Sequence, residues 1–199
     1  MTEFFLNNKK VKAKDDETIW TVAKREGIVL PHLCFADKPG YRADGNCRAC
    51  MVSIEGERVL AASCIRKPTE GMKVITNDER STKSRKMVLE LLVTDQPDRE
   101  TSHDPDSHFW NVASSVDVAK SRFDKREKTI VPCEDASHVA MSVNLDACIH
   151  CNLCVRACRE VQVNDVIGMG NRGHHSKVIF DFNDPMGDSS CVSCGECVQ

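Results

Sequence analysis

Short runs of alternating apolar and polar residues predict that the chain begins as a small mixed α/β domain. Asn7 and Asn8 separate two such runs and suit the tight turn of a β-hairpin. A helix is predicted over residues 17–26, because its apolar residues recur at helical spacing, Asp16 can cap its start and Gly27 follows its end. The predicted strands are residues 4–6, 11–14, 51–54, 59–62 and 74–76.

The apolar positions change period in the middle of the chain. Apolar residues at positions 87, 88, 91 and 92 predict a helix over residues 80–93, and Pro97 lies beyond its end. A second helix is predicted around residues 107–120, followed by a polar linker to about residue 134. No cysteine occurs from position 65 to 132, which sets this region apart from its flanks.

The last region combines a short helix with a strand. Asn144 can cap a helix that carries closely spaced cysteines, and residues 178–182 alternate like a strand. The whole pattern predicts the α+β class, divided into residues 1–78, 79–135 and 136–199.

Charge and composition exclude several classes of protein. The formal net charge of −3 gives no field for nucleic acid or an anionic membrane, and the basic clusters at residues 83–86 and 122–128 are interpreted as solvated helix faces or docking surface. Neither a secretory signal nor an apolar run of membrane-spanning length is found, so we expect a cytoplasmic protein. Thiols are kept reduced in that compartment, and the twelve cysteines therefore indicate metal binding rather than disulfides.

One cysteine run has the spacing C-x2-C-x2-C-x3-C, formed by Cys148, Cys151, Cys154 and Cys158. This spacing is typical of four-iron clusters in bacterial ferredoxins, where three thiolates wrap one cluster and the fourth binds a second cluster. Zinc is the alternative, but zinc sites draw their thiolates from two separated pairs, which an unbroken run of three fits poorly.

A second copy of the run begins at Cys191, Cys194 and Cys197. Two copies imply two clusters with crossed fourth ligands, so Cys158 is expected to complete this site. The site of Cys148, Cys151 and Cys154 would then need a cysteine at a position 201, so we expect the sequence to be truncated and this cluster to be labile or of the three-iron type. Arg159 stands where simple ferredoxins have proline, so the helix can continue there.

The third group of cysteines, Cys34, Cys47, Cys50 and Cys64, lies in the strand-rich N-terminal segment. Four thiolates on a loop suit a two-iron cluster, with Gly40 and Gly45 allowing the backbone to approach the sulfides. The first gap of twelve residues differs from the plant-type spacing C-x4-C-x2-C. The Cys47-x2-Cys50 pair alone would also fit a redox or zinc site.

Several other features are interpreted as structural. The G-x-G-x-x-G match at residues 168–173 is predicted to be a flexible loop, because no helix is expected after it. The adjacent His174 and His175 are interpreted as surface or partner contacts, and Cys133 as a free thiol. His32 either tunes the nearby cluster by hydrogen bonding or packs within its loop. No nucleophile elbow, P-loop or zinc-protease motif is found, as expected for a module that only relays electrons.

The order of these sites resembles the N-terminal part of the large complex I iron–sulfur subunit, the diaphorase subunit of NAD-reducing hydrogenases and the alpha subunit of NAD-dependent molybdenum or tungsten formate dehydrogenases. The resemblance covers essentially all 199 residues. It implies a β-grasp two-iron ferredoxin-like domain, a helical middle and a double four-iron ferredoxin-like domain. Residues 144–168, 173–177 and 184–187 look most like the formate dehydrogenase alpha subunit, which is the preferred identification.

The chain departs from these families in the middle region. They place there a four-iron cluster held by one histidine and three cysteines, with the pattern H-x3-C-x2-C-x5-C. Counted from His103, the cysteine positions hold Ser107, Trp110 and Val116. None of these can replace a thiolate, so this cluster is expected to be absent, with Trp110 and Val116 filling its space.

The resemblance also implies the cofactors and partners. A molybdopterin with molybdenum or tungsten, C-terminal to residue 199, would oxidise formate to carbon dioxide, and a partner subunit with FMN and NAD would receive the electrons. A small iron–sulfur subunit would complete the hetero-oligomer. The alternatives are a hydrogenase diaphorase or complex I subunit, a free-standing ferredoxin-like carrier, or a zinc-binding interaction module.

Overall fold

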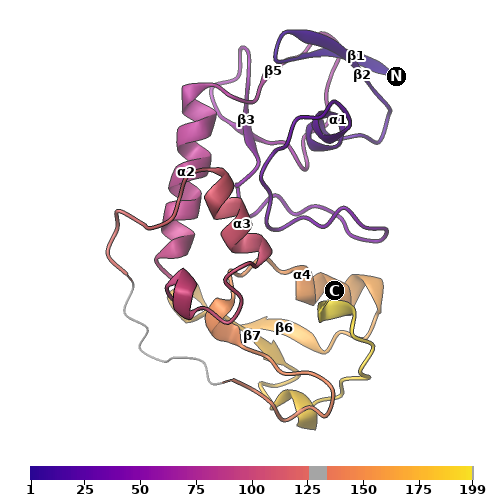
Figure 1. The fold of residues 1–199 in the computed structure, drawn as a ribbon. Helices are drawn as coiled ribbons and strands as arrows, with labels where there is room; N and C mark the ends of the chain where they lie inside the picture. The colour runs from indigo at the N-terminus through magenta and orange to yellow at the C-terminus, as the bar shows by residue number, and fades with distance from the viewer. Residues whose placement is uncertain (126–133, 199) are drawn as a thin grey trace. The chain divides into compact units, whose positions relative to one another are not determined.

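The computed structural model describes residues 1–125 and 134–198 and divides into two compact units (Figure 1). Unit 1 consists of Met1–Phe35, Ala43–Thr94 and Asp106–Lys125. The described part of unit 2 consists of Ala36–Arg42, Asp95–Pro105 and residues 134–198. The predicted domain boundaries at residues 78 and 135 remain predictions, and Cys133 lies outside the described residues.

Unit 1 is built on a mixed five-stranded sheet in the order β2-β1-β5-β3-β4. β1 pairs in parallel with β5, and the other pairs are antiparallel. Asn7 and Asn8 both have positive φ, 49° and 66°, which is the twist that a two-residue hairpin needs, so the predicted turn is confirmed. β4 has half the predicted length, and Val59, at the predicted start of this strand, is exposed. The strands are β1 (Thr2–Leu6), β2 (Lys9–Ala13), β3 (Met51–Ile54), β4 (Ala61–Ala62) and β5 (Lys73–Ile75).

Helix α1 (Ile19–Arg25) supplies the other side of this core. Its N-cap is Thr18, whose hydroxyl accepts from the Thr21 N–H at 3.3 Å, so the predicted cap at Asp16 is wrong by two residues. Gly27 has φ +77° directly beyond the C-cap, as predicted. The buried face of α1 consists of Ile19, Trp20, Val22 and Ala23, which pack with the inward residues of the sheet.

Helices α2 (Glu79–Val93) and α3 (His108–Ser115) complete unit 1, and α2 confirms the predicted helix (Figure 1). α3 ends five residues before the predicted boundary. Asp117 takes the left-handed conformation there, φ 58°, and the Val118 N–H donates to the Ala113 carbonyl at 2.9 Å. This is a Schellman ending with aspartate in the position usually held by glycine, which sequence periodicity does not reveal.

Unit 2 contains the hairpin β6 (Ile167–Gly170) and β7 (Lys177–Phe180) and the short helix α4 (Leu153–Arg156). α4 continues as a π-helical turn over Ala157–Val161, so the predicted helical course at Arg159 is confirmed. The flexible loop predicted over residues 168–173 is wrong in its first half. Gly170 belongs to β6, because its missing Cβ leaves room for Ile179, whose Cγ2 would lie 2.9 Å from a Cβ there. The residues after β6 form a 3-10 turn, Gly173–His175, before β7.

Cysteines form part of the small core of unit 2. Cys158 is buried together with apolar residues of the hairpin, and four further cysteines pack against this cluster while partly exposed. The buried members are Val155, Cys158, Val166, Ile167, Val178, Phe180 and Met186. Within the described parts of the chain, no helix has the length and apolarity that crossing a membrane requires.

Asp78, the N-cap of α2, provides a test of the fold. Its carboxylate accepts from the Ser81 N–H at 3.4 Å and from the Ser53 hydroxyl at 2.8 Å. Burial alone would raise the pKa of Asp78, but hydrogen bonds from Ser81 and Ser53 outweigh it and lower the pKa below its ordinary value. The stabilisation is therefore complete above the unfolded-state pKa and is lost as the pH falls through the folded-state pKa.

We predict that Asp78→Ala lowers the free energy of unfolding by about 1 kcal/mol at neutral pH. The difference from the unsubstituted chain should shrink as the pH falls below about 4. Urea unfolding followed by circular dichroism at several pH values measures both effects. Glu79→Ala, at the exposed next residue, is the control and should cost about 0.3 kcal/mol. Equal losses in the two variants would contradict the capping role.

Candidate metal centres

The structure brings the four N-terminal cysteines together in unit 1. Cys34, Cys50 and Cys64 are buried, and Cys47 is half-buried. Hydrogen bonds from the Cys47 and Cys64 thiols lower the pKa of Cys34 to about 2. A hydrogen bond from Cys64 likewise lowers the pKa of Cys50 to about 6. The same thiol contacts, followed by burial, raise the pKa of Cys47 and Cys64. Two of the four sulfurs are thus favoured as thiolates, the form that binds metal.

The loop before Cys47 is shaped to turn backbone donors toward sulfur. The Cys47 N–H donates to Cys34 Sγ at 3.4 Å. Gly45 has φ +63°, and a Cβ on it would stand 2.8 Å from Ile65 Cδ1, so glycine is suited to this position on both counts. Gly40, which was also expected beside the cluster, belongs to unit 2, where its α-carbon faces Val161.

His32 lies two residues before Cys34 and packs among aromatic rings. Its ring centroid is 4.7 Å from that of Trp20 and 5.2 Å from that of His108. The His108 ring Nε2 and the His32 carbonyl oxygen are 2.8 Å apart. These contacts support the interpretation of His32 as a packed loop residue.

Arg85 is a buried cation beside this group that the sequence analysis missed. It is 7% exposed, and its guanidinium donates to the Met51 carbonyl at 3.1 Å and the Thr76 carbonyl at 2.7 Å. Burial lowers the pKa of Arg85, while the charges of Asp78 and Cys50 oppose that shift. The interpretation of residues 83–86 as a solvated helix face is therefore wrong at Arg85, although Lys83 and Lys86 are exposed.

In unit 2, four cysteines line one pocket that is partly open to solvent. They are Cys158, Cys191, Cys194 and Cys197, the set expected from crossed ligands. The Val166 N–H donates to Cys158 Sγ at 3.3 Å, so a backbone donor faces the buried sulfur. Burial, followed by the charges of Cys191 and Cys194, raises the pKa of Cys197.

The remaining three cysteines, Cys148, Cys151 and Cys154, come together beside α4. Burial, followed by the charges of Cys151 and Cys148, raises the pKa of Cys154 to about 12. All three side chains are half-buried. These sulfurs are close enough to influence one another electrostatically, as ligands of one cluster would be.

The two cysteine runs of unit 2 have the same local backbone. His150 and Ser193 occupy equivalent positions, have φ 52° and 58°, and donate their N–H groups to Cys148 Sγ and Cys191 Sγ, each at 3.4 Å. The residue after the second cysteine is also left-handed in both runs, Asn152 with φ 60° and Gly195 with φ +73°. The repeated spacing in the sequence therefore corresponds to a repeated turn that points N–H groups at sulfur.

These arrangements fit iron–sulfur clusters. Thiolates converging on a pocket and backbone N–H groups directed at sulfur are what such clusters need, and hydrogen bonds to sulfur also adjust their potentials. Across residues 1–125 and 134–198, no three His, Cys, Asp or Glu side chains are arranged to hold a single metal ion. The assignment of the individual ligands remains a prediction.

In the middle region, the positions where the related families have histidine and cysteine ligands can be compared with the structure. Ser107 caps α3, Trp110 is 3% exposed and contacts the Phe109 ring at a centroid distance of 5.1 Å, and Val116 is half-buried at the helix end. His103 is exposed. The burial of Trp110 supports the hypothesis that apolar packing fills this space.

Comparison with known proteins identifies the class of the N-terminal part. Residues 1–79 match the family model described as the 2Fe-2S iron-sulfur cluster binding domain. Together with the mixed sheet and the four gathered thiols, this match defines a 2Fe-2S ferredoxin-like domain.

The relatives of the whole chain are oxidoreductase subunits. It is 29% identical over its full length to the NADP-reducing hydrogenase subunit HndD of Solidesulfovibrio fructosivorans. It is 28% identical over 88% of its length to the mitochondrial NADH-ubiquinone oxidoreductase 78 kDa subunit of Candida albicans (strain SC5314 / ATCC MYA-2876). It is also 28% identical over 87% of its length to the putative formate dehydrogenase SH0748 of Staphylococcus haemolyticus (strain JCSC1435). The resemblance derived from the cysteine pattern is thus confirmed.

A solved structure agrees over almost the entire chain. The crystal structure of an NAD+-reducing [NiFe]-hydrogenase in the H2-reduced state matches 96% of this chain and 80% of its own matched chain, with a TM-score of 0.82 and 26% identity. The chain spans a smaller part of the curated relatives: 34% of HndD, 24% of the 78 kDa subunit and 17% of SH0748.

The buried Arg85 provides a test of the two-iron site. We predict that Arg85→Gln lowers the free energy of unfolding by about 1.5–3 kcal/mol, because the Met51 and Thr76 carbonyls lose charged donors. The two-iron cluster should also be retained less well on anaerobic purification. Lys86→Gln, at the exposed next residue of α2, should change stability by less than about 0.5 kcal/mol. Urea unfolding and iron content measure both variants, and similar effects of the two would refute this role of Arg85.

Proposed function

We propose that the chain is the electron-transfer module of an NAD-dependent formate dehydrogenase. The observation that carries the proposal is the gathering of eleven cysteines into three groups, with backbone N–H groups directed at sulfur in each group. Iron–sulfur clusters bound there would take up and release single electrons. The middle region would add no further cluster.

Each group of cysteines is assigned a cluster. Unit 1 would hold a [2Fe-2S] cluster, and unit 2 would hold two [4Fe-4S] clusters in a double ferredoxin-like domain. Two of the proposed sets have four cysteines and one has three. The proposed ligand sets are Cys34, Cys47, Cys50 and Cys64; Cys158, Cys191, Cys194 and Cys197; and Cys148, Cys151 and Cys154.

The chain's own residues prepare these sites for electron transfer. Cys34, Cys50 and Cys158 are buried, so water is excluded from these sulfurs. The N–H groups of Cys47, His150 and Ser193 donate to sulfur and stabilise its negative charge. Because these donors belong to the backbone, little rearrangement is needed when the charge of a site changes. No substrate site is assigned to the chain itself.

The choice of formate as substrate of the complete enzyme rests on two resemblances. Residues 144–168 look most like the formate dehydrogenase alpha subunit, and the putative formate dehydrogenase SH0748 is among the relatives. In this proposal a molybdopterin with molybdenum or tungsten would supply formate oxidation outside the present sequence. A partner subunit with FMN would pass the electrons to NAD, and a small iron–sulfur subunit would join the hetero-oligomer.

A second candidate is the diaphorase subunit of an NAD-reducing hydrogenase. The observation that favours it is the agreement with the [NiFe]-hydrogenase structure, which extends over 96% of this chain with a TM-score of 0.82. Both candidates assign the same role to the cysteines, so they differ only in the enzyme that the module serves.

The ligand assignment predicts a selective loss in Cys158→Ser. This variant should lose one four-iron cluster and keep the two-iron cluster, because Cys158 lines the pocket with Cys191, Cys194 and Cys197. Iron and acid-labile sulfide analysis with electron paramagnetic resonance (EPR) of the anaerobically purified protein measures the loss. Cys133→Ser, at a cysteine outside all three ligand sets, is the control and should keep every cluster. Zinc in place of iron, or an unchanged iron content in Cys158→Ser, would exclude the assignment.

The proposed substrate is tested on the protein that contains this chain, isolated with its partner subunits. Formate should reduce NAD+ to NADH with release of carbon dioxide, and hydrogen gas should not. NADH absorbance under formate and under hydrogen measures the two activities. Reduction by hydrogen alone would favour the second candidate, and activity with neither donor would oppose both.

A further inference from the structure

Arg156, at the end of α4, is the buried charged residue of unit 2 among the residues that the structure describes. It is 3% exposed and lies two residues after Cys154. Charged side chains are rarely buried to this extent, because removal from water is unfavourable unless polar groups replace the lost hydration. The partners of Arg156 therefore indicate what the buried charge does.

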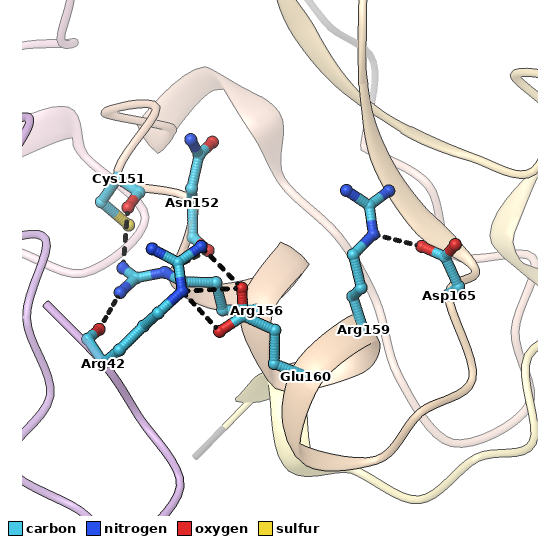
Figure 2. A network of polar contacts seen from close by, with 7 residues as sticks. All are labelled: Arg42, Cys151, Asn152, Arg156, Arg159, Glu160 and Asp165. Atoms are coloured by element: carbon cyan, nitrogen blue, oxygen red, sulfur yellow. Dashed lines mark hydrogen bonds and ion pairs between the residues drawn. The ribbon is translucent and has the colours of Figure 1, made fainter. Parts of the chain in front are cut away.

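The guanidinium of Arg156 holds the ligand loop between the second and third cysteines of its run (Figure 2). Nη2 donates to the Cys151 carbonyl and Nε to the Asn152 carbonyl, each at 3.3 Å. Asn152 has the left-handed backbone, φ 60°, that the loop needs. Arg156 thus fixes two successive carbonyls at the point where the chain turns between Cys151 and Cys154.

A third carbonyl comes from a different part of the chain. Arg156 Nη1 donates to the carbonyl of Arg42, in the segment Ala36–Arg42 that belongs to unit 2 (Figure 2). The Arg42 side chain in turn forms a two-pronged pair with Glu160, with Nε 3.0 Å from Oε2 and Nη2 2.7 Å from Oε1. Because Arg42 is largely exposed, this pair contributes little to stability, and its effect is to hold the Arg42 carbonyl in place.

The same segment also contacts the second cysteine run. The Tyr41 hydroxyl donates to Glu196 Oε1 at 2.9 Å, next to Cys197 in the chain. Burial, followed by this hydrogen bond, raises the pKa of Tyr41 to about 12, so the phenol keeps its proton. Tyr41 and Arg42 therefore connect the two runs, and Arg156 is the buried end of that connection.

The charge of Arg156 lies beside the proposed cluster site, since Nη2 donates to the Cys151 carbonyl. Reduction adds one negative charge to a cluster, and a fixed cation in a medium of low dielectric constant stabilises that added charge. The three carbonyl partners of Arg156 hold the guanidinium beside Cys151.

We propose that Arg156 is a positioning residue that fixes the loop of Cys148, Cys151 and Cys154 and raises the reduction potential of the cluster held there. This inference rests on the proposed function, since it needs a cluster at this site. Nothing in the sequence pattern distinguishes Arg156 from the exposed Arg159 three residues later.

The test compares Arg156→Gln and Arg156→Lys with the matched control Arg159→Gln in the protein that contains this chain. Arg159 lies in the same helical stretch, is exposed and pairs with Asp165. Each variant is purified anaerobically, its clusters are counted by iron and sulfide analysis, and EPR-monitored titration with dithionite gives the midpoint potential of each cluster. A midpoint potential that shifts in Arg156→Gln but not in Arg156→Lys separates the effect of the charge from that of lost packing.

We expect Arg156→Gln to lower the potential of one four-iron cluster. The ratio of its reduced to oxidised form at a fixed ambient potential should fall about tenfold, which is about 59 mV for one electron. Arg156→Lys keeps the charge and should stay within about twofold of the unsubstituted protein, although it loses donors to the carbonyls. Arg159→Gln should leave every potential unchanged.

Other outcomes also decide the proposal. Selective loss of one four-iron cluster in Arg156→Gln, with retention in Arg156→Lys and Arg159→Gln, supports it. Unchanged potentials in an intact Arg156→Gln protein overturn it, and so does equal cluster loss in Arg156→Gln and Arg159→Gln. Absence of four-iron clusters from the unsubstituted protein would instead refute the proposed function, so the two failures can be told apart.

Discussion

Backbone N–H groups directed at cysteine sulfur are the contact on which the candidate sites depend. They exist because single residues adopt left-handed conformations between or before the cysteines, as His150 and Ser193 do at equivalent places in unit 2. A left-handed non-glycine residue costs roughly 1–2 kcal/mol, so each of these turns has to be stabilised by its surroundings. Bound clusters would provide such stabilisation, because they cross-link the loops that carry the turns.

Both units also place a buried arginine beside their thiols. Arg85 in α2 donates to the carbonyl of Met51, directly after Cys50, and Arg156 in α4 donates to the carbonyl of Cys151. In each case the arginine comes from a helix and the acceptor is a carbonyl of the cysteine-bearing segment. Because each arginine donates to a backbone carbonyl and not to sulfur, it holds the cysteine-bearing segment in place and leaves the thiolate free to bind iron.

The parts of the fold that follow from local rules were predicted from the sequence. The hairpin turn at Asn7 and Asn8 and the helix α2 follow from turn chemistry and periodicity. The pocket of unit 2 is lined by Cys158, Cys191, Cys194 and Cys197, which the spacing had grouped, while their role as ligands stays a prediction. The two-iron domain and the class of the relatives were also anticipated from the cysteine pattern.

The remaining features depend on tertiary contacts that periodicity does not contain. The N-cap of α1 is Thr18 and not the predicted Asp16. Gly170 lies in a strand and not in the predicted loop, because Ile179 packs where a side chain on residue 170 would be. Arg85 and Arg156 look like surface residues in the sequence, since nothing local indicates that backbone carbonyls will surround them. Burial of a charge is decided by the partners that folding supplies.

The long first gap of the N-terminal cysteine group has a structural explanation. Plant-type ferredoxins need four residues there, whereas this chain uses twelve between Cys34 and Cys47, and seven of the twelve, Ala36–Arg42, belong to unit 2. Excising the first 79 residues as a miniature ferredoxin would therefore remove Tyr41 and Arg42 from their neighbours and leave the Arg156 guanidinium short of an acceptor. Grafting this domain elsewhere would require a redesigned loop, because the present loop joins Cys34 to Cys47 and also supplies residues to unit 2.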